Sequence, residues 1–185
     1  MSKILSKKNL SNVVFIVAVA LLIYPPTRVW FLRQIAFSPS VIKAEKIEKL
    51  DTYHWNLKGI NTVDINLIEF KNEVVFVNFW ATWCPPCRAE MPMIQKLYDS
   101  YEGKVKFILV TNESASKVEE YFQKNNFNLP VYNSISKVPV KFSGTNSIPA
   151  SYLIDKEGNI VISKTGTANW NSKKVRILVD DLLVK

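Results

Sequence analysis

The sequence predicts an α/β sandwich, in which a central mixed sheet carries helices on both faces and an N-terminal β-hairpin extends the sheet. Two dense apolar runs, at residues 74–80 and 105–111, are typical of strands buried on both faces. Each is followed by a segment of helical periodicity, and strand–helix–strand units place their strands in parallel. A hairpin pattern near the C-terminus adds antiparallel strands, so the predicted sheet is mixed.

The first half of the predicted domain opens with a hairpin, because strand-like residues 53–57 and 63–65 flank a turn that contains Gly59. After the first buried strand, a helix is predicted from apolar residues at spacings of three and four, and Gly103 ends it. After the second buried strand, Ser116 and Glu119 form a capping box, which predicts the start of another helix.

The C-terminal part begins with a short strand over 129–132. Residues 147–155 and 160–165 then flank Lys156-Glu157-Gly158-Asn159, whose composition is typical of a hairpin turn. A last helix is predicted after Ser172, which is a favourable N-cap residue. Two strands and a helix therefore complete the predicted sandwich.

Composition excludes several classes of protein. The 185 residues are 48% hydrophobic and 22% charged, which indicates a globular chain of about one domain. Of the net charge of +8, residues 1–50 carry +6 and residues 51–185 only +2. A nucleic-acid groove needs basic residues on the folded domain, so no nucleic-acid partner is predicted. Two cysteines and one histidine, His54, predict neither a disulfide-rich scaffold nor a histidine metal centre, and no metal or cofactor is expected.

The N-terminal segment resembles a membrane-targeting element. Lysines precede the unbroken apolar run 13–23, and the uncharged stretch 9–27 would reach ~28 Å as a helix. Because no small-x-small cleavage site follows closely, residues 1–27 are predicted to be an uncleaved transmembrane signal anchor rather than a cleaved signal peptide. Residues 28–50 would then connect it to a domain at 51–185. The basic N-terminus predicts an inner-membrane protein with its domain on the extracytoplasmic (periplasmic) side.

The candidate chemistry lies in Cys84-Pro85-Pro86-Cys87, which follows a buried strand and opens a helix. If Cys84 is the N-cap, Pro85 occupies N1, where its missing N–H costs nothing. The Cys87 N–H can then point at the Cys84 sulfur, and the helix dipole adds positive potential there. Both effects favour the thiolate. Cys84 is therefore predicted to be the more exposed, attacking sulfur, and Cys87 the resolving one.

Two other interpretations of this pair are weaker. A zinc site needs about four nitrogen or sulfur ligands, and the chain offers only two cysteines and His54. A purely structural disulfide would close a very small loop, which gives little entropic stabilisation.

The stretch Phe79-Trp80-Ala81-Thr82-Trp83-Cys84-Pro85-Pro86-Cys87-Arg88, with the following Glu90-Met91-Pro92, resembles the TlpA/ResA-type branch of the thioredoxin fold. Ser147-Ile148-Pro149-Ala150 resembles the cis-proline loop of that family, and the resemblance extends over about residues 51–185. It implies a thioredoxin-like, membrane-anchored thiol–disulfide oxidoreductase that acts on a protein dithiol or disulfide and exchanges electrons with a transmembrane donor.

The resemblance also implies roles for single residues. Pro149 would be a cis-proline facing the cysteines, and the Ile148 backbone would bind a substrate chain. Next to the cysteines, Trp83 is expected to line the substrate-facing surface, with a packing role as the open alternative, and Pro85 is a further candidate for that surface. Glu90 would handle protons for the thiols, and its place three residues after Cys87 puts it on the same helical face. A solvated Glu90 favoured by the helix dipole is the open alternative. Asn78 replaces a buried aspartate of thioredoxin and cannot act as a base.

The sequence leaves the direction of the reaction open. A reductase of protein disulfides is favoured, with apocytochrome c before haem attachment as one candidate client. A dithiol oxidase uses the same chemistry in reverse, because direction depends on the reduction potential. A peroxidase ranks low, since the expected peroxidatic loop is absent. A membrane-tethered binding domain without enzymatic activity is the alternative from another class.

Overall fold

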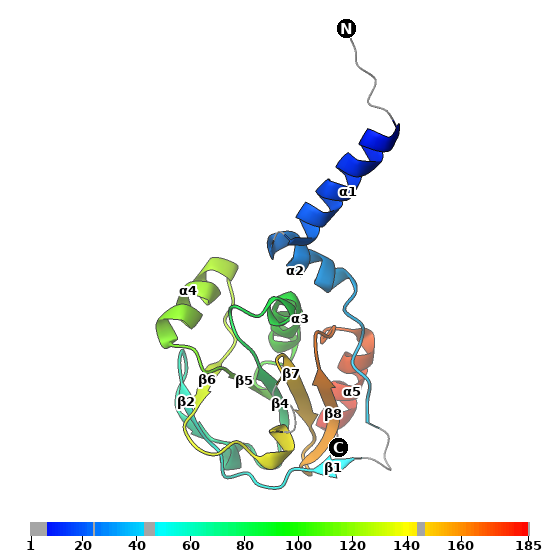
Figure 1. Cartoon of the computed structure of the whole chain (residues 1–185). Helices are drawn as coiled ribbons and strands as arrows, with labels where there is room; N and C mark the ends of the chain where they lie inside the picture. Colours follow the sequence, from blue (N-terminus) through cyan, green and yellow to red (C-terminus); the bar gives the residue numbers. More distant parts are fainter. Residues whose placement is uncertain (1–6, 24, 43–46, 144–146, 185) are drawn as a thin grey trace.

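The structure, a computed structural model, describes residues 7–23, 25–42, 47–143 and 147–184 (Figure 1). Its strands, in chain order, are β1 (Glu48–Lys49), β2 (Asn56–Gly59), β3 (Ile65–Asn66), β4 (Val74–Phe79), β5 (Val105–Val110), β6 (Val131–Ser134), β7 (Ala150–Ile154) and β8 (Asn159–Thr165). Its helices are α1 (Lys7–Ile23), α2 (Pro25–Gln34), α3 (Pro85–Tyr101), α4 (Ala115–Asn125), α5 (Lys173–Val184) and the 3-10 turns η2 (Leu67–Phe70) and η3 (Val140–Phe142).

The strands form one mixed sheet in the order β1-β8-β7-β4-β5-β6-β2-β3. Strands β4, β5 and β6 are parallel, because α3 and α4 serve as crossover connections between them. Strand β7 pairs antiparallel with both β4 and β8. The predicted opening hairpin is present as β2 and β3, and β2 joins the sheet through β6. The predicted fold class is therefore confirmed.

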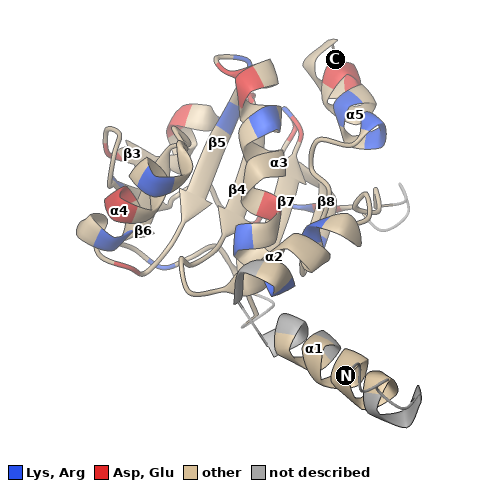
Figure 2. Cartoon of the chain, turned by 90° about the horizontal axis from the view of Figure 1, so that it is seen from above, with Lys and Arg blue, Asp and Glu red and all other residues tan. Residues whose placement is uncertain are grey.

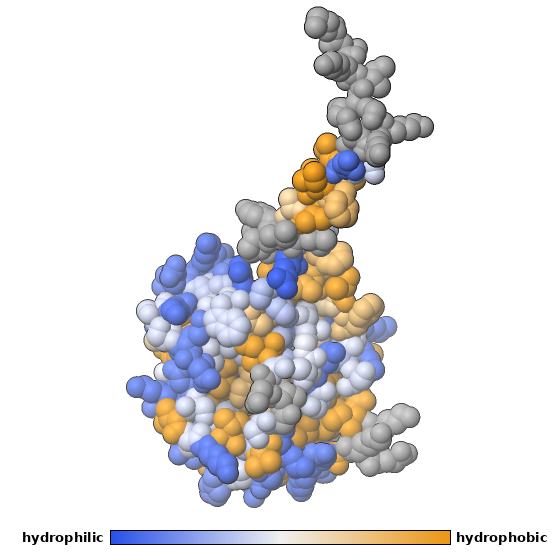
Figure 3. Space-filling model, viewed as in Figure 1, coloured by the Kyte–Doolittle hydropathy of each residue, from blue (hydrophilic) through white to orange (hydrophobic). Residues whose placement is uncertain are grey.

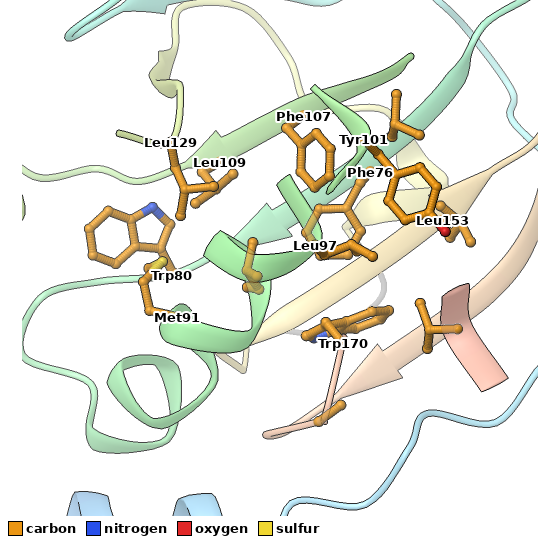
Figure 4. Packing of buried hydrophobic residues seen from close by; sticks show 14 of the residues in the cluster. Phe76, Trp80, Met91, Leu97, Tyr101, Phe107, Leu109, Leu129, Leu153 and Trp170 are labelled. Atoms are coloured by element: carbon orange, nitrogen blue, oxygen red, sulfur yellow. The ribbon is translucent and has the colours of Figure 1, made fainter. Parts of the chain in front are cut away.

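Two hydrophobic clusters lie on opposite faces of this sheet, because alternate residues of each strand point to opposite sides. In β4, Val74 and Phe76 belong to one cluster, whereas Val75 and Val77 belong to the other. Helices α3, α4 and α5 all contribute buried side chains to the first cluster, and Figure 4 shows it packed around Trp170 and Phe76. The 3-10 turns η2 and η3 cover the second cluster.

Most helix ends lie where local features of the sequence predict them. Gly103 follows α3 in a left-handed conformation, with φ of +77°, which favours glycine. The Val175 N–H donates to Ser172 Oγ at 3.4 Å at the predicted start of α5. The predicted capping box was wrong, however. Helix α4 has Ser114 as its N-cap, and its first residues therefore precede the predicted box at Ser116.

The connector predicted over 28–50 lies against the domain. It contains most of α2, which begins at Pro25 inside the segment predicted as the anchor, and its extended part donates the Ile42 N–H to the Val161 carbonyl of β8 at 2.9 Å. Strand β1 then pairs antiparallel with β8, and Leu50 is buried in the second cluster. These contacts position α2 beside α3 (Figure 1).

Helix α1 occupies the segment predicted to be a transmembrane anchor. The prediction of a transmembrane helix is not confirmed, since within the described parts of the chain no helix has both the length and the apolar character needed to cross a membrane. Helix α1 projects from the domain, and Figure 3 shows its surface to be largely hydrophobic. Its large exposed apolar side chains are Leu10, Val13, Val14, Phe15, Ile16, Val17 and Val19.

Candidate active site

The start of α3 has the predicted N-cap geometry. Cys84 is the N-cap in an extended conformation, Pro85 and Pro86 open the helix, and the Cys87 N–H points at Cys84 Sγ at 3.2 Å. The two sulfurs form a disulfide, with the Cα atoms 5.3 Å apart. In the reduced protein the same N–H and the helix dipole would stabilise a thiolate at Cys84. The structure thus shows the oxidised form of a pair built for thiol–disulfide exchange.

The predicted order of exposure is present, but the difference is small. Cys87 is fully buried, as predicted for the inner sulfur, and Cys84 is 3% exposed. Cys84 belongs to the same buried cluster as Trp80 and Met91. In this oxidised structure, therefore, neither sulfur is open to solvent.

Helix α2 covers the outward face of α3 next to this pair. Ala89 and Lys96 lie seven residues apart on the same helical face, yet Lys96 is exposed and Ala89 has no exposed surface. Val29 of α2 is 7% exposed, and α2 packs along α3. Sequence reasoning missed this contact, since nothing local to α2 indicates where a connector will dock.

The second side of the site is the loop before β7. The Ile148–Pro149 peptide bond is cis, as the resemblance implied. Cys84 Sγ lies 3.8 Å from the Ile148 carbonyl oxygen, so this loop borders the disulfide. Trp83 is 70% exposed, and together with Ile148 it lines a hollow of about 450 Å³. Pro85 is half-buried at the first helical position.

Glu90 lies on α3 one turn beyond Cys87 and has no exposed surface. Its Oε1 accepts from Asn78 Nδ2 at 2.9 Å, and its Oε2 accepts from the Ala168 N–H and from Trp170 Nε1, both at 3.1 Å. Burial raises the pKa of Glu90 to about 8, although these three donors act in the opposite direction. The open alternative of a solvated Glu90 is therefore wrong.

The surroundings of Glu90 were only partly accessible to sequence reasoning. Asn78 could be singled out from the sequence because it lies six residues before Cys84. Its Nδ2 also donates to Ser151 Oγ at 2.8 Å. No sequence signal pointed to Ala168 or Trp170, which are about 80 residues away along the chain. Among the described residues, no group of three or more His, Cys, Asp or Glu side chains is placed to hold a metal ion.

Glu113 holds the loop that precedes the cysteines, and sequence reasoning missed it too. Its carboxylate accepts from both the backbone N–H and the Oγ1 of Thr82, the latter at 2.7 Å. The Glu113 backbone is fixed in turn, because Asn133 Nδ2 donates to its carbonyl at 3.1 Å. Because both donors belong to Thr82, the Glu113 carboxylate acts as a clamp that restrains the loop carrying Trp83.

We expect Glu113→Ala to lower the free energy of unfolding by about 2 kcal/mol, because the half-buried Thr82 donors lose a charged partner. Urea denaturation of the oxidised protein measures the change. The matched control is Glu119→Ala, an exposed glutamate of α4. Equal stability of the Glu113 and Glu119 variants would show that the clamp contributes nothing.

Together, the mixed sheet, the helix-capping disulfide and the adjacent cis-proline define a thioredoxin-like protein. The model of the Redoxin family matches residues 55–182. The chain belongs to the Redoxin family, and within it to the thioredoxin-like oxidoreductases of the ResA type.

Individual relatives agree with this assignment. "Thiol-disulfide oxidoreductase ResA" of Bacillus thuringiensis subsp. konkukian is 37% identical over 99 residues, which are 52% of this chain and 57% of that protein. The ResA of Bacillus subtilis is 30% identical over 65% of this chain and 68% of its own length. The crystal structure of StoA from Bacillus subtilis matches with a TM-score of 0.54 and 24% identity over 80% of this chain and 98% of that one, and it supports the fold. The chain thus spans just over half the length of the first of these relatives.

Proposed function

We propose that this protein is an extracytoplasmic thiol–disulfide oxidoreductase that reduces protein disulfides through Cys84 and Cys87. The observation that carries the proposal is the helix-capping pair, in which Cys84 Sγ faces the Cys87 N–H beside the cis-Pro149 loop. Exchange at such a pair needs no metal or cofactor, because the sulfurs themselves carry the two electrons.

The proposed reaction starts from the dithiol. The Cys84 thiolate attacks one sulfur of a client disulfide, and the other client sulfur leaves as a thiolate that takes up a proton. The Cys87 thiol loses its proton and attacks Cys84 Sγ, which releases the second client thiol. This step leaves the Cys84–Cys87 disulfide seen in the structure. Two electrons and two protons from a membrane dithiol donor then restore the reduced pair.

Glu90 is the proposed proton acceptor for Cys87, one turn away on α3. It also supports the reducing direction. In its ionised form, Glu90 one turn from Cys87 would oppose thiolate formation, and an enzyme whose reduced form is not specially stabilised holds its electrons less tightly. The hollow beside Trp83 and Ile148 is the proposed contact for the client chain, with apocytochrome c as one candidate client. Because Cys84 is 3% exposed in the oxidised state, attack on the disulfide by the dithiol donor requires the surrounding side chains to open.

We also propose that the segment 1–27 tethers the domain to the inner membrane, with 28–50 as connector and 51–185 as the extracytoplasmic domain. The exposed apolar side chains of α1 support a lipid contact. The lysines at positions 3, 7 and 8 favour a cytoplasmic N-terminus.

A titration of the Cys84–Cys87 pair against glutathione tests the direction. A reductase is expected to have a potential near that of thioredoxin, about −270 mV, so that the pair stays oxidised in buffers that already reduce DsbA. A value near the roughly −120 mV of DsbA would instead identify a dithiol oxidase. The Cys87→Ser variant is the control, because it cannot form the internal disulfide.

A further inference from the structure

A second hollow, of about 270 Å³, lies on the domain beside the cysteine-bearing helix. Its lining includes Arg88 of α3 together with Lys117, Tyr121 and Lys124 of α4. The Arg88 guanidinium lies 5.7 Å from the centre of the Tyr121 ring. We call this site the basic hollow.

The lining of the basic hollow is positively charged. Glu120 is the acidic residue in the lining, so Arg88, Lys117 and Lys124 leave a local charge of +2. Within the described residues, the salt bridges join Lys106 to Glu73 and Lys141 to Glu48, and none of these three lining cations takes part in them. Burial raises the pKa of Tyr121, and the positive charges of Arg88 and of Arg33 on α2 oppose that rise.

The positive charge of the domain is concentrated at the basic hollow, since residues 51–185 carry a net charge of only +2 in total. Figure 2 looks down on the domain from the side from which α1 projects, and it shows α2, α3 and α4 with Lys or Arg positions on each, together with Asp or Glu positions on α3 and α4. Helix α2, ten residues or about 15 Å long, follows the apolar α1 and packs along α3, the helix that carries Arg88 of the basic hollow. A bilayer that holds α1 would therefore meet these cations.

We propose that the basic hollow binds the phosphate of anionic lipid head groups and so docks the domain against the membrane surface. The inference rests on the proposed tether. Lysine and arginine side chains next to an anionic surface attract it, each by about 1 kcal/mol, and arginine is suited to phosphate oxygens. The exposed aromatic side chains of Trp30 and Phe31 on α2 suit the same interface. Docking in this way would hold the Cys84 end of α3 near the membrane, where the proposed electron donor lies.

The test uses the full chain in vesicles of phosphatidylcholine, with or without phosphatidylglycerol, and measures acylation of each lysine by mass spectrometry. Lys117 and Lys124 are expected to react about fivefold more slowly when phosphatidylglycerol is present, which corresponds to about 1 kcal/mol for each cation. High salt should abolish the difference. Lys58 and Lys104, exposed on β2 and after α3, should react equally in both kinds of vesicle.

Charge reversal provides a matched second readout. Lys117→Glu/Lys124→Glu should remove the phosphatidylglycerol-dependent protection of α4 amides in hydrogen exchange, whereas Lys58→Glu/Lys104→Glu, with the same change in net charge, should retain it. Both variants should reduce a soluble disulfide as the parent does, which shows that they fold.

Equal labelling of Lys117 and Lys124 in both kinds of vesicle would overturn the proposal, as would the same protection by inorganic phosphate without lipid, which would identify a site for a soluble anion. Protein that stays with neutral vesicles and reduces disulfides but shows no lipid dependence would refute the docking alone. Protein that washes off both kinds of vesicle would refute the tether as well.

Discussion

Replacing Cys84 by serine is expected to lower the rate of insulin disulfide reduction by about 10³-fold or more, down to the rate of the reductant alone. A serine hydroxyl keeps the size of the side chain and can still accept the Cys87 N–H, but it cannot form or exchange a disulfide. The loss would therefore reflect chemistry rather than a damaged helix start. The turbidity assay with dithiothreitol as electron source measures it.

The Cys87→Ser variant should behave differently, and the contrast assigns the two roles. Its Cys84 can still attack a client disulfide, but nothing resolves the product, so a mixed disulfide accumulates that a non-reducing gel detects. The double variant, with both cysteines replaced, should trap nothing. If Cys84→Ser preserved the function of the protein in cells, the alternative of a membrane-tethered binding domain would be favoured instead.

These expectations depend on features that sequence reasoning could reach, because they are local. Cys84 caps α3 as a result of four consecutive residues, since Pro85 starts a helix and the N–H at N3 points back to the cap. The cis-Pro149 was reached through the family resemblance and not from physics alone. The parallel pairing of β4 with β5 followed from the alternating strand and helix patterns, because a helical crossover places the strands it joins in parallel.

Contacts between segments that are distant along the chain could not be predicted from the sequence. The burial of Cys84 depends on how Trp80 and Met91 pack around it, and the cover of α3 depends on how the connector helix α2 docks, and no periodicity encodes either. Trp170 reaches Glu90 only because the loop before α5 returns to α3. The same reason explains the missed clamp of Glu113 on Thr82, which joins the ends of two neighbouring parallel strands.

The buried carboxyl of Glu90 predicts a pH dependence of stability whose sign follows from its pKa. Burial raises the pKa of Glu90 from 4.5 to about 8 in the folded protein. Between these values the folded state holds a proton that the unfolded state has released, so stability falls as the pH rises from about 4.5 to about 8. Each pH unit in this window costs up to about 1.4 kcal/mol, and above pH 8 the loss is complete.

Glu90→Gln should remove this slope, because an amide does not ionise. The amide oxygen can accept from the Ala168 N–H and Trp170 Nε1, as Oε2 does now. Its NH2 group can meet Asn78, whose Oδ1 is buried without a hydrogen-bond partner. The variant should therefore resemble the parent near pH 5 and exceed it in stability by several kcal/mol near pH 9.

Urea unfolding of the oxidised protein at pH 5, 7 and 9 measures the difference, with exposed Glu119→Gln as the control that should keep the parent slope. Glu90→Ala should be less stable than Glu90→Gln at every pH, since it leaves the Ala168, Trp170 and Asn78 donors without an acceptor. Parallel stability curves for the parent and Glu90→Gln would mean that Glu90 is already ionised in the folded state at pH 5. Its three donors would then outweigh its burial, and its pKa would lie too far below that of a thiol for it to take up the Cys87 proton efficiently.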